Sequence, residues 1–265
     1  MNKHMICSAA ALAGAAAAAS ADIPPGLYGY DPNANGIISI DTATGAGSFY
    51  ANAHGDGFSS RSLGHVPGSD LFYALDASAV DQLLTFDGSG VATVVGPLGI
   101  DGVFHALAYD TGAETLYTID RAATKQLYTV DPITGAAAPV GAPGALAGLS
   151  PSGLAFDEVT STLYMADQST DSLYTVDTGT GAATLVGGFG IGNIDLNGLA
   201  FDPATGSLFM STESPYVLYE LSTADGTATE IGAIGFTITG MTFVPAPGAV
   251  ALLGFTGLAA ARRRR

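Results

Sequence analysis

The sequence repeats one four-residue phrase three times, as Leu107-Ala-Tyr-Asp110, Leu154-Ala-Phe-Asp157 and Leu199-Ala-Phe-Asp202. Weaker copies stand at Leu63-Gly-His-Val66 and Met241-Thr-Phe-Val244. The first residues of successive copies are 44, 47, 45 and 42 positions apart. A repeat of about 40–45 residues is typical of the blades of a β-propeller. The spacing therefore predicts an all-β propeller with one copy of the phrase in each blade.

Each repeat contains four short runs with the composition of β-strands, which we name A, B, C and D in chain order. In the clearest repeat they cover residues 153–156, 162–166, 172–176 and 182–186. The A–B and C–D connections carry turn sequences such as Asp202-Pro-Ala-Thr-Gly206 and Asp131-Pro-Ile-Thr-Gly135. An Asp side chain accepts hydrogen bonds from its own turn, and Gly supplies the positive φ that closes a hairpin. We therefore predict a structural role for these aspartates.

The two ends of the repeat region complement each other. The first strand-like runs, at 27–30, 37–40 and 48–51, correspond to B, C and D without a preceding A. The last run, at 239–244, corresponds to an A strand that nothing follows. Pairing the last strand with the first would close the ring and remove its open edges. The sequence thus predicts a five-bladed β-propeller of four-stranded blades over residues 22–244.

Bulky pairs recur in strand B, at Leu116-Tyr117, Leu163-Tyr164 and Leu208-Phe209. Because they recur in successive blades, we interpret these aromatic residues as core between blades rather than as a platform for stacking carbohydrate.

Residues 1–21 have the features of a signal peptide. Lys3 and His4 precede an Ala-rich apolar stretch from Met5 to Ala19, and Ala19-Ser20-Ala21 matches a small-residue cleavage site. The only cysteine of the chain, Cys7, lies in this segment. We therefore expect an exported mature protein without disulfides or thiolate metal sites.

The mature domain is strongly acidic. It contains all 24 acidic residues of the chain and three basic residues, Arg61, Arg121 and Lys125, which gives a formal charge of −21. Such a surface repels phosphate backbones and argues against nucleic acid as a partner. It suits an extracellular or saline setting and is compatible with divalent cations, and the alternative is an acidic coat that keeps the protein soluble.

The C-terminal composition differs from that of the repeats. Val244-Pro245-Ala246-Pro247 leads into an uncharged segment at 248–261, and the chain ends with Arg262, Arg263, Arg264 and Arg265. Residues 244–261 form an apolar stretch near the lower limit of about 17–25 residues for a membrane-spanning helix. Terminal arginines favour the cytoplasmic side of the membrane. We therefore expect residues 245–265 to be a separate tail with a short transmembrane helix.

This order of a Pro-rich motif, an apolar helix and an Arg cluster resembles the PEP-CTERM sorting tail of exported bacterial proteins, with VPAP in place of VPEP. The resemblance covers Val244 to Arg265 and assigns sorting roles to Val244, Pro245, Pro247 and the four arginines. It implies transient anchoring in the inner membrane, removal of the tail by an exosortase-type protease, and delivery to the cell surface or extracellular matrix. Residues 22–244 resemble secreted bacterial β-propeller repeat proteins more broadly, and this resemblance implies a fold without an activity.

Two rings of residues are candidate sites at the face formed by the D–A and B–C loops. The first ring lies two positions before the repeated Leu or Met and is polar but different in every blade. It suits either a ligand-binding channel mouth or a solvated pore. Its members are Arg61, His105, Ser152, Asn197 and Thr239.

The second ring ends strand B in four blades and consists of Asp31, Asp76, Asp120 and Asp167. Four carboxylates at equivalent positions are candidate ligands for Ca²⁺, which prefers oxygen donors. The alternative is that each Asp caps its own B–C turn.

The leading hypothesis is a non-enzymatic binding or scaffold propeller outside the cell, with a polysaccharide or another surface protein as partner. The alternative is a Ca²⁺-dependent hydrolase or lactonase that acts at the same face, and a purely structural spacer is a third possibility. The sequence places no Glu at the inner end of strand A, and His54, His65 and His105 form no recognisable metal motif. We therefore name no catalytic residue, and we interpret His65 as a packed residue within a strand.

Overall fold

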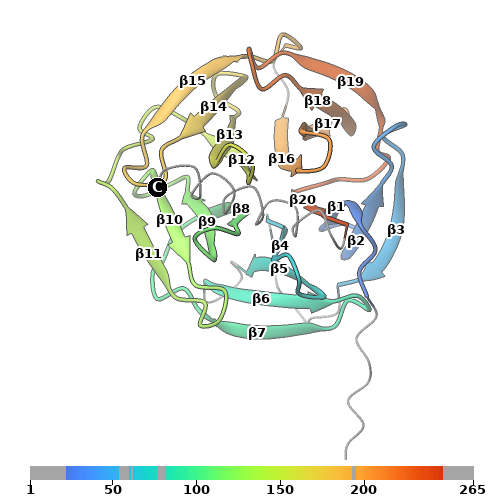
Figure 1. The fold of residues 1–265 in the computed structure, drawn as a ribbon, viewed down its shortest axis with the longest axis horizontal. Helices are drawn as coiled ribbons and strands as arrows, with labels where there is room; N and C mark the ends of the chain where they lie inside the picture. Colours follow the sequence, from blue (N-terminus) through green and yellow to red (C-terminus); the bar gives the residue numbers. More distant parts are fainter. Residues whose placement is uncertain (1–21, 54–59, 61, 77–80, 193–194, 247–265) are drawn as a thin grey trace, which may run out of the picture.

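The computed structural model describes residues 22–53, 60, 62–76, 81–192 and 195–246, without the side chains of residues 196 and 197. In these residues the chain forms twenty strands in five antiparallel four-stranded sheets arranged around a common centre (Figure 1). The fold predicted from the repeat, a five-bladed β-propeller, is confirmed.

The blades are numbered in chain order, and their strands are given from the inner strand A to the outer strand D. Blade 1 comprises β20 (Gly240–Val244), β1 (Gly26–Asp31), β2 (Gly36–Ile40) and β3 (Gly47–Asn52). Blade 2 comprises β4 (Gly64–His65), β5 (Leu71–Asp76), β6 (Gln82–Asp87) and β7 (Ala92–Pro97). Blade 3 comprises β8 (Phe104–Asp110), β9 (Thr115–Asp120), β10 (Gln126–Val130) and β11 (Ala137–Val140). Blade 4 comprises β12 (Pro151–Asp157), β13 (Thr162–Asp167), β14 (Ser172–Val176) and β15 (Ala183–Gly188). Blade 5 comprises β16 (Asp195–Asp202), β17 (Ser207–Ser214), β18 (Val217–Leu221) and β19 (Ala228–Ala233).

The ring closes through blade 1, as the complementary ends predict. Strand β20 pairs antiparallel with β1 from Gly26↔Val244 to Tyr30↔Gly240. The last strand therefore supplies the inner edge of the blade that begins the chain, and the two strands lie side by side in Figure 1.

The hydrophobic core is divided among the five interfaces between neighbouring blades. Each buried cluster combines residues of two adjacent blades. At the interface of blades 3 and 4, Tyr117 of strand B stacks on Phe156 of the next strand A, with ring centroids 6.2 Å apart. Tyr164 and Phe201 repeat this contact at 6.5 Å between blades 4 and 5. Such pairs contribute about 0.5–1.5 kcal/mol beyond area burial, and the prediction that the strand-B aromatics form core is confirmed.

A ring of glycine contacts joins the periphery of the blades. The C–D turns contain Gly with φ between 72° and 85° at positions 45, 90, 135, 181 and 226. Each of these glycines lies against the outer strand of the preceding blade, or the residues just after it, and a Cβ there would meet backbone atoms. Two residues later, Gly47, Ala137 and Ala228 donate backbone hydrogen bonds of 2.9–3.0 Å to the preceding blade. The turns thus set the spacing between blades as well as reversing the chain.

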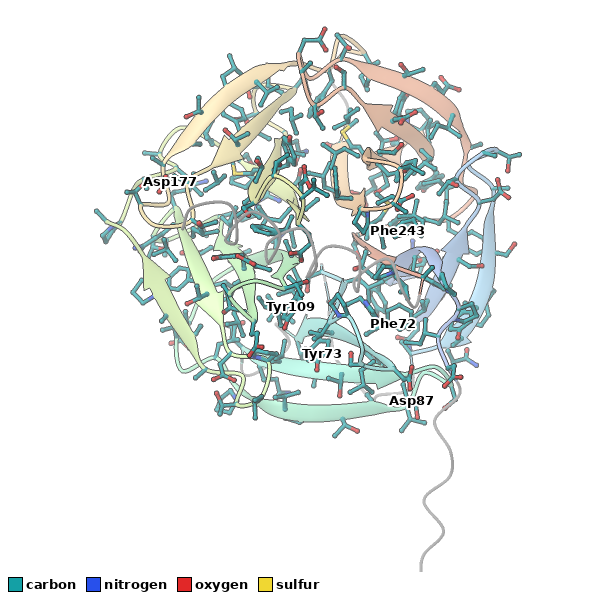
Figure 2. All side chains as sticks on the ribbon, viewed as in Figure 1. Phe72, Tyr73, Asp87, Tyr109, Asp177 and Phe243 are labelled. Carbon is teal, nitrogen blue, oxygen red and sulfur yellow. The ribbon has the colours of Figure 1, made fainter. Side chains whose placement is uncertain are left out.

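The turn aspartates have the structural role predicted for them. Asp177 Oδ1 accepts hydrogen bonds from the backbone N–H of Thr180 at 2.7 Å and of Gly179 at 3.1 Å. The hydroxyl of Thr180 donates to the same oxygen at 2.8 Å, and these bonds lower the pKa of Asp177. Asp177 and Asp87 both lie at the outer rim of the ring, far from its centre (Figure 2).

Two adjacent glycines of β15 test the contact between blades. A Cβ at Gly187 would overlap the backbone carbonyl of Asp225 in blade 5, whereas a Cβ at Gly188 would have its nearest neighbour at 3.8 Å. We expect Gly187→Ala to lower the free energy of unfolding by about 1–3 kcal/mol, as overpacking does. Gly188→Ala should stay within about 0.5 kcal/mol of the parent. Urea unfolding of the three proteins measures the difference, and equal stabilities would contradict the role of the contact.

Candidate functional site in the central channel

The five inner strands line a central channel with two chemically different ends. Each strand A runs from a D–A loop to an A–B turn. We call the end formed by the D–A and B–C loops the loop face, and the end formed by the A–B and C–D turns the turn face. The described members of both predicted rings lie at the loop face.

The first predicted ring is held within the blades as far as the structure describes it. His105, Ser152 and Thr239 are all buried. The hydroxyl of Ser152 donates to the backbone oxygen of Ala166 at 3.3 Å, and that of Thr239 lies within 3.3–3.4 Å of the backbone oxygens of Ser60 and Tyr30. His105 Nδ1 lies 3.4 Å from Arg121 Nη1. Arg61 and the side chain of Asn197 lie outside the described residues, so binding at this ring stays a prediction.

The second ring consists of buried carboxylates, three of which hold their own B–C loops. Asp31 Oδ1 accepts from the backbone N–H of Asn33 at 2.7 Å and of Ala34 at 3.1 Å. Asp167 accepts hydrogen bonds from Ser169 and from both the backbone and the hydroxyl of Thr170.

The other two members of this ring also accept hydrogen bonds. Asp76 accepts from Gln82 Nε2 at 3.1 Å. Asp120 accepts from the backbone N–H groups of Val103, Ala122 and Thr124. Burial opposes ionisation of Asp120, but these bonds outweigh it and lower its pKa. Among the described residues, no three His, Cys, Asp or Glu side chains are grouped so that they could hold a metal ion.

A cavity of about 70 Å³ lies at the turn-face half of the channel. One buried water needs about 10–15 Å³ of such a volume, so the cavity has room for several waters or one compact ligand. Its walls come from the ends of all five inner strands, and the side chains that matter most are one histidine, one glutamate and four aromatic rings. They are His65, Tyr109, Phe156, Glu158, Phe201 and Phe243. Figure 2 shows Tyr109 and Phe243 on the inner strands near the centre of the ring.

His65 is the wall residue with an unused hydrogen-bonding atom. The side chain is only 7% exposed, and its Nε2 donates to the backbone oxygen of Ser69 at 3.1 Å. In that tautomer Nδ1 carries a lone pair, and this buried atom has no hydrogen-bond partner. Burial lowers the pKa of His65, which favours the neutral ring. The interpretation of His65 as a packed residue is confirmed. The structure also shows that its Nδ1 is a buried acceptor without a hydrogen-bond partner.

Glu158 connects the A–B turns of blades 3 and 4. Its carboxylate accepts from the hydroxyl of Thr111 at 2.6 Å and from the backbone N–H of Thr111 at 2.9 and 3.2 Å. Burial raises the pKa of Glu158, and the neighbouring charges of Asp110 and Asp157 raise it further. Burial also raises the pKa of Tyr109, and the negative charges of Glu114 and Glu158 raise it further. The electrostatic potential at this end of the channel is therefore negative.

The sequence contains a signal for these residues, although the two predicted rings lie toward the other face. Position three of the repeated phrase is aromatic in Tyr109, Phe156, Phe201 and Phe243, and only blade 2 has a histidine there. Likewise, Glu158 follows the phrase where the other blades have Thr111, Pro203, Pro67 or Pro245. Departures from a structural repeat at equivalent positions are where a site is most easily distinguished from the scaffold.

The closed ring of five four-stranded sheets defines the chain as a five-bladed β-propeller. No protein-family model matches the sequence, and no curated protein matches it. In structure, it is similar to a structural-genomics protein of unknown function from Bacteroides thetaiotaomicron, with 18% identity over 81% of this chain and a TM-score of 0.54. The match spans 58% of that protein, so this chain corresponds to little more than half of its length.

The chain is also similar to one in a nidogen/laminin complex, with 13% identity over 82% of this chain and 97% of that chain, and a TM-score of 0.56. A third similar structure is a catalytically inactive virginiamycin B lyase from Staphylococcus aureus crystallised with quinupristin. It has 10% identity over 77% of this chain and 68% of that chain, and a TM-score of 0.48. At these identities the comparisons show the fold alone.

The described part of the chain contains no helix long and apolar enough to cross a membrane. The predicted signal peptide (1–21) and residues 247–265 of the predicted sorting tail lie outside the described residues.

Replacement of Glu158 by Gln tests the negative potential at the turn face. Because the folded pKa of Glu158 is raised, its contribution to stability is present below the ordinary pKa of Glu and is lost as the pH rises through the raised value. The amide oxygen of Gln can still accept from the hydroxyl and the backbone N–H of Thr111, and only the longer 3.2 Å contact to the second carboxylate oxygen is lost together with the charge. We expect the melting temperature of Glu158→Gln relative to the parent to increase between about pH 4 and pH 8. Glu220→Gln, on the exposed side of β18, is the matched control, and a parallel increase in it would contradict the assignment.

The Ca²⁺ prediction is tested by thermal unfolding with Ca²⁺, with Mg²⁺ and with a chelator. A ligand that binds only the folded state raises the melting temperature with its occupancy. Because the four aspartates already accept hydrogen bonds from their loops or nearby side chains, we expect the melting temperature to be the same with Ca²⁺ and with chelator. A rise specific to Ca²⁺ that persists in high NaCl and is lost in Asp167→Asn would establish the metal site.

Proposed function

We propose that the chain is an exported surface or extracellular-matrix protein whose propeller is a non-enzymatic binding or scaffold module. In this proposal the signal peptide directs export, and residues 245–265 anchor the domain transiently in the inner membrane. An exosortase-type protease then removes the tail. The sequence patterns at both ends of the chain support export and sorting, and the closed ring supports a rigid module.

The observation that carries the proposal is the position of the two ends of the domain. Gly26 and Val244 pair with each other at the start of β1 and the end of β20. Both strands reach the turn face at these residues, so the domain is connected to its flanking segments at one face only. A module held in this way presents its opposite face, the loop face, to whatever lies outside the cell.

The distance available to the tail reinforces this orientation. Only residues 245–247 separate the last strand from the uncharged segment that begins at Gly248. Three residues span at most about 10 Å when fully extended. With the apolar segment in the bilayer, the turn face would lie next to the membrane and the loop face would point away from it.

The loop face has the properties of a preorganised binding surface. The B–C loops of blades 1, 3 and 4 are held by hydrogen bonds to Asp31, Asp120 and Asp167, so these loops have little conformational entropy left to lose when a partner binds. The face also carries both basic residues of the described chain, Arg121 and Lys125, which lie between β9 and β10. These features favour an extended partner such as a polysaccharide or another surface protein.

Cysteine labelling on cells that express the full chain tests the orientation. Cys7 is the only native cysteine and lies in the predicted signal peptide. A cysteine introduced into the processed protein is therefore its only thiol and the only site of labelling. Ser169→Cys places it in an exposed loop of the loop face, and Ala204→Cys in an exposed turn of the turn face. We expect a bulky, membrane-impermeant maleimide to label Ser169→Cys faster in the membrane-bound fraction, and both variants equally in the released fraction.

Equal labelling of the two variants in the membrane-bound fraction would contradict the proposed orientation. Replacement of Arg262–Arg265 by serines provides the control for sorting, because it should leave the fold intact and reduce release to the medium. Unchanged release in that variant would count against the sorting tail.

A further inference from the structure

The turn face is anionic and, among the described residues, contains no basic side chain. All five blades carry acidic residues in their A–B or C–D turns. The basic residues of the described chain lie at the opposite face, in the β9–β10 loop. A ligand that approaches the channel from the turn face therefore enters a negative potential, which attracts cations and repels anions.

The cavity at this face combines aromatic walls with hydrogen-bond acceptors. Tyr109, Phe156, Phe201 and Phe243 line it together with Glu158. Aromatic rings attract organic cations through their quadrupole, and a nearby carboxylate adds a direct Coulomb attraction. Phe156 and Phe201 are fixed in place by stacking on tyrosines of the preceding blade, so the wall is rigid before any ligand arrives.

His65 specifies the kind of cation. Its Nδ1 is a buried acceptor without a partner in a side chain that lines the cavity. An unsatisfied buried acceptor costs about 1–3 kcal/mol. The Nδ1 atom is covered in the unliganded channel, so a ligand reaches it by displacing the imidazole slightly, and a hydrogen bond donated to it then recovers part of that cost. The complementary ligand therefore carries an N–H donor as well as a positive charge.

From these observations we propose that the turn-face half of the channel is a binding site for a small primary alkylammonium ion. The aromatic rings contact its alkyl group, Glu158 balances its charge and His65 Nδ1 accepts one of its N–H hydrogens. This site is separate from the loop face of the proposed function, and its test does not depend on export or anchoring.

Three probes of similar size separate charge from hydrogen bonding. Isobutylammonium carries both the charge and the donor, tetramethylammonium carries the charge alone, and isobutanol carries a donor without the charge. We expect saturable binding to the purified protein by NMR titration, tightest for isobutylammonium and weakest for isobutanol. Equal binding of isobutanol and isobutylammonium, or no saturable binding of isobutylammonium at millimolar concentrations, would overturn the proposal.

Variants assign the contributions to single residues. Glu158→Gln should weaken isobutylammonium binding by about fivefold, as expected for the loss of a partly buried charge partner. The control Glu220→Gln should leave it unchanged. His65→Phe restores the residue type found in three other blades, so it should remain folded, weaken isobutylammonium and leave tetramethylammonium unaffected. An equal loss for both cations in His65→Phe, with an unchanged melting temperature, would refute the role of the histidine.

The same alkylammonium chemistry occurs in free amines and in the ethanolamine headgroup of phospholipids. Vesicles of phosphatidylethanolamine and phosphatidylglycerol, compared with vesicles of phosphatidylglycerol alone, distinguish the two. Sedimentation of the protein only with the ethanolamine-containing vesicles assigns the headgroup, and binding of soluble amine without sedimentation assigns a free amine.

Discussion

The contact between each C–D turn and the outer strand of the preceding blade constrains the whole ring. The turn glycines at positions 45, 90, 135, 181 and 226 recur every 45 or 46 residues, which is more regular than the repeated phrase of the inner strands. At each of them a backbone approaches another backbone with no room for a side chain. Because this contact fixes the rotation from one blade to the next, it helps set the number of blades that close the circle and the width of the channel.

The inner strands could vary because the outer contacts hold the blades in place. Strand A needs only an apolar first residue and a flat or compact third residue that packs on the preceding blade. The third position therefore accepts Tyr109, Phe156 or Phe201 without change to the fold, and in blade 2 it accepts His65. The histidine and Glu158 are found where the scaffold permits a polar substitution facing the channel, and the rigid rings around them provide a low-dielectric environment.

The sequence predicted the fold well because the same strand and turn patterns recur in each of the five blades. The strands, the turn aspartates, the core aromatics and the closure through the last strand were all apparent from periodicity and composition. The candidate site was harder to find, because it depends on how side chains of different blades meet. Buried hydrogen bonding of Ser152 and Thr239 cannot be read from one sequence, since a polar residue at a loop end is equally consistent with binding and with capping. The cavity at the turn face depends on the side-chain volumes of five strands that are distant in sequence.

Closure by β20 has a consequence for the order in which the protein can be completed. Nineteen of the twenty described strands pair with neighbours in the sequence, as meanders do, whereas β20 pairs with a strand more than two hundred residues earlier. Local hairpins form early, but the ring cannot close before its last strand is available. A chain that is cut short, or still in transit through a translocation pore, keeps the edge of β1 unpaired and the first blade incomplete. The fold is therefore complete only when the whole domain has emerged. The strand that completes it directly precedes, in the sequence, the segment that is expected to hold the domain at the membrane.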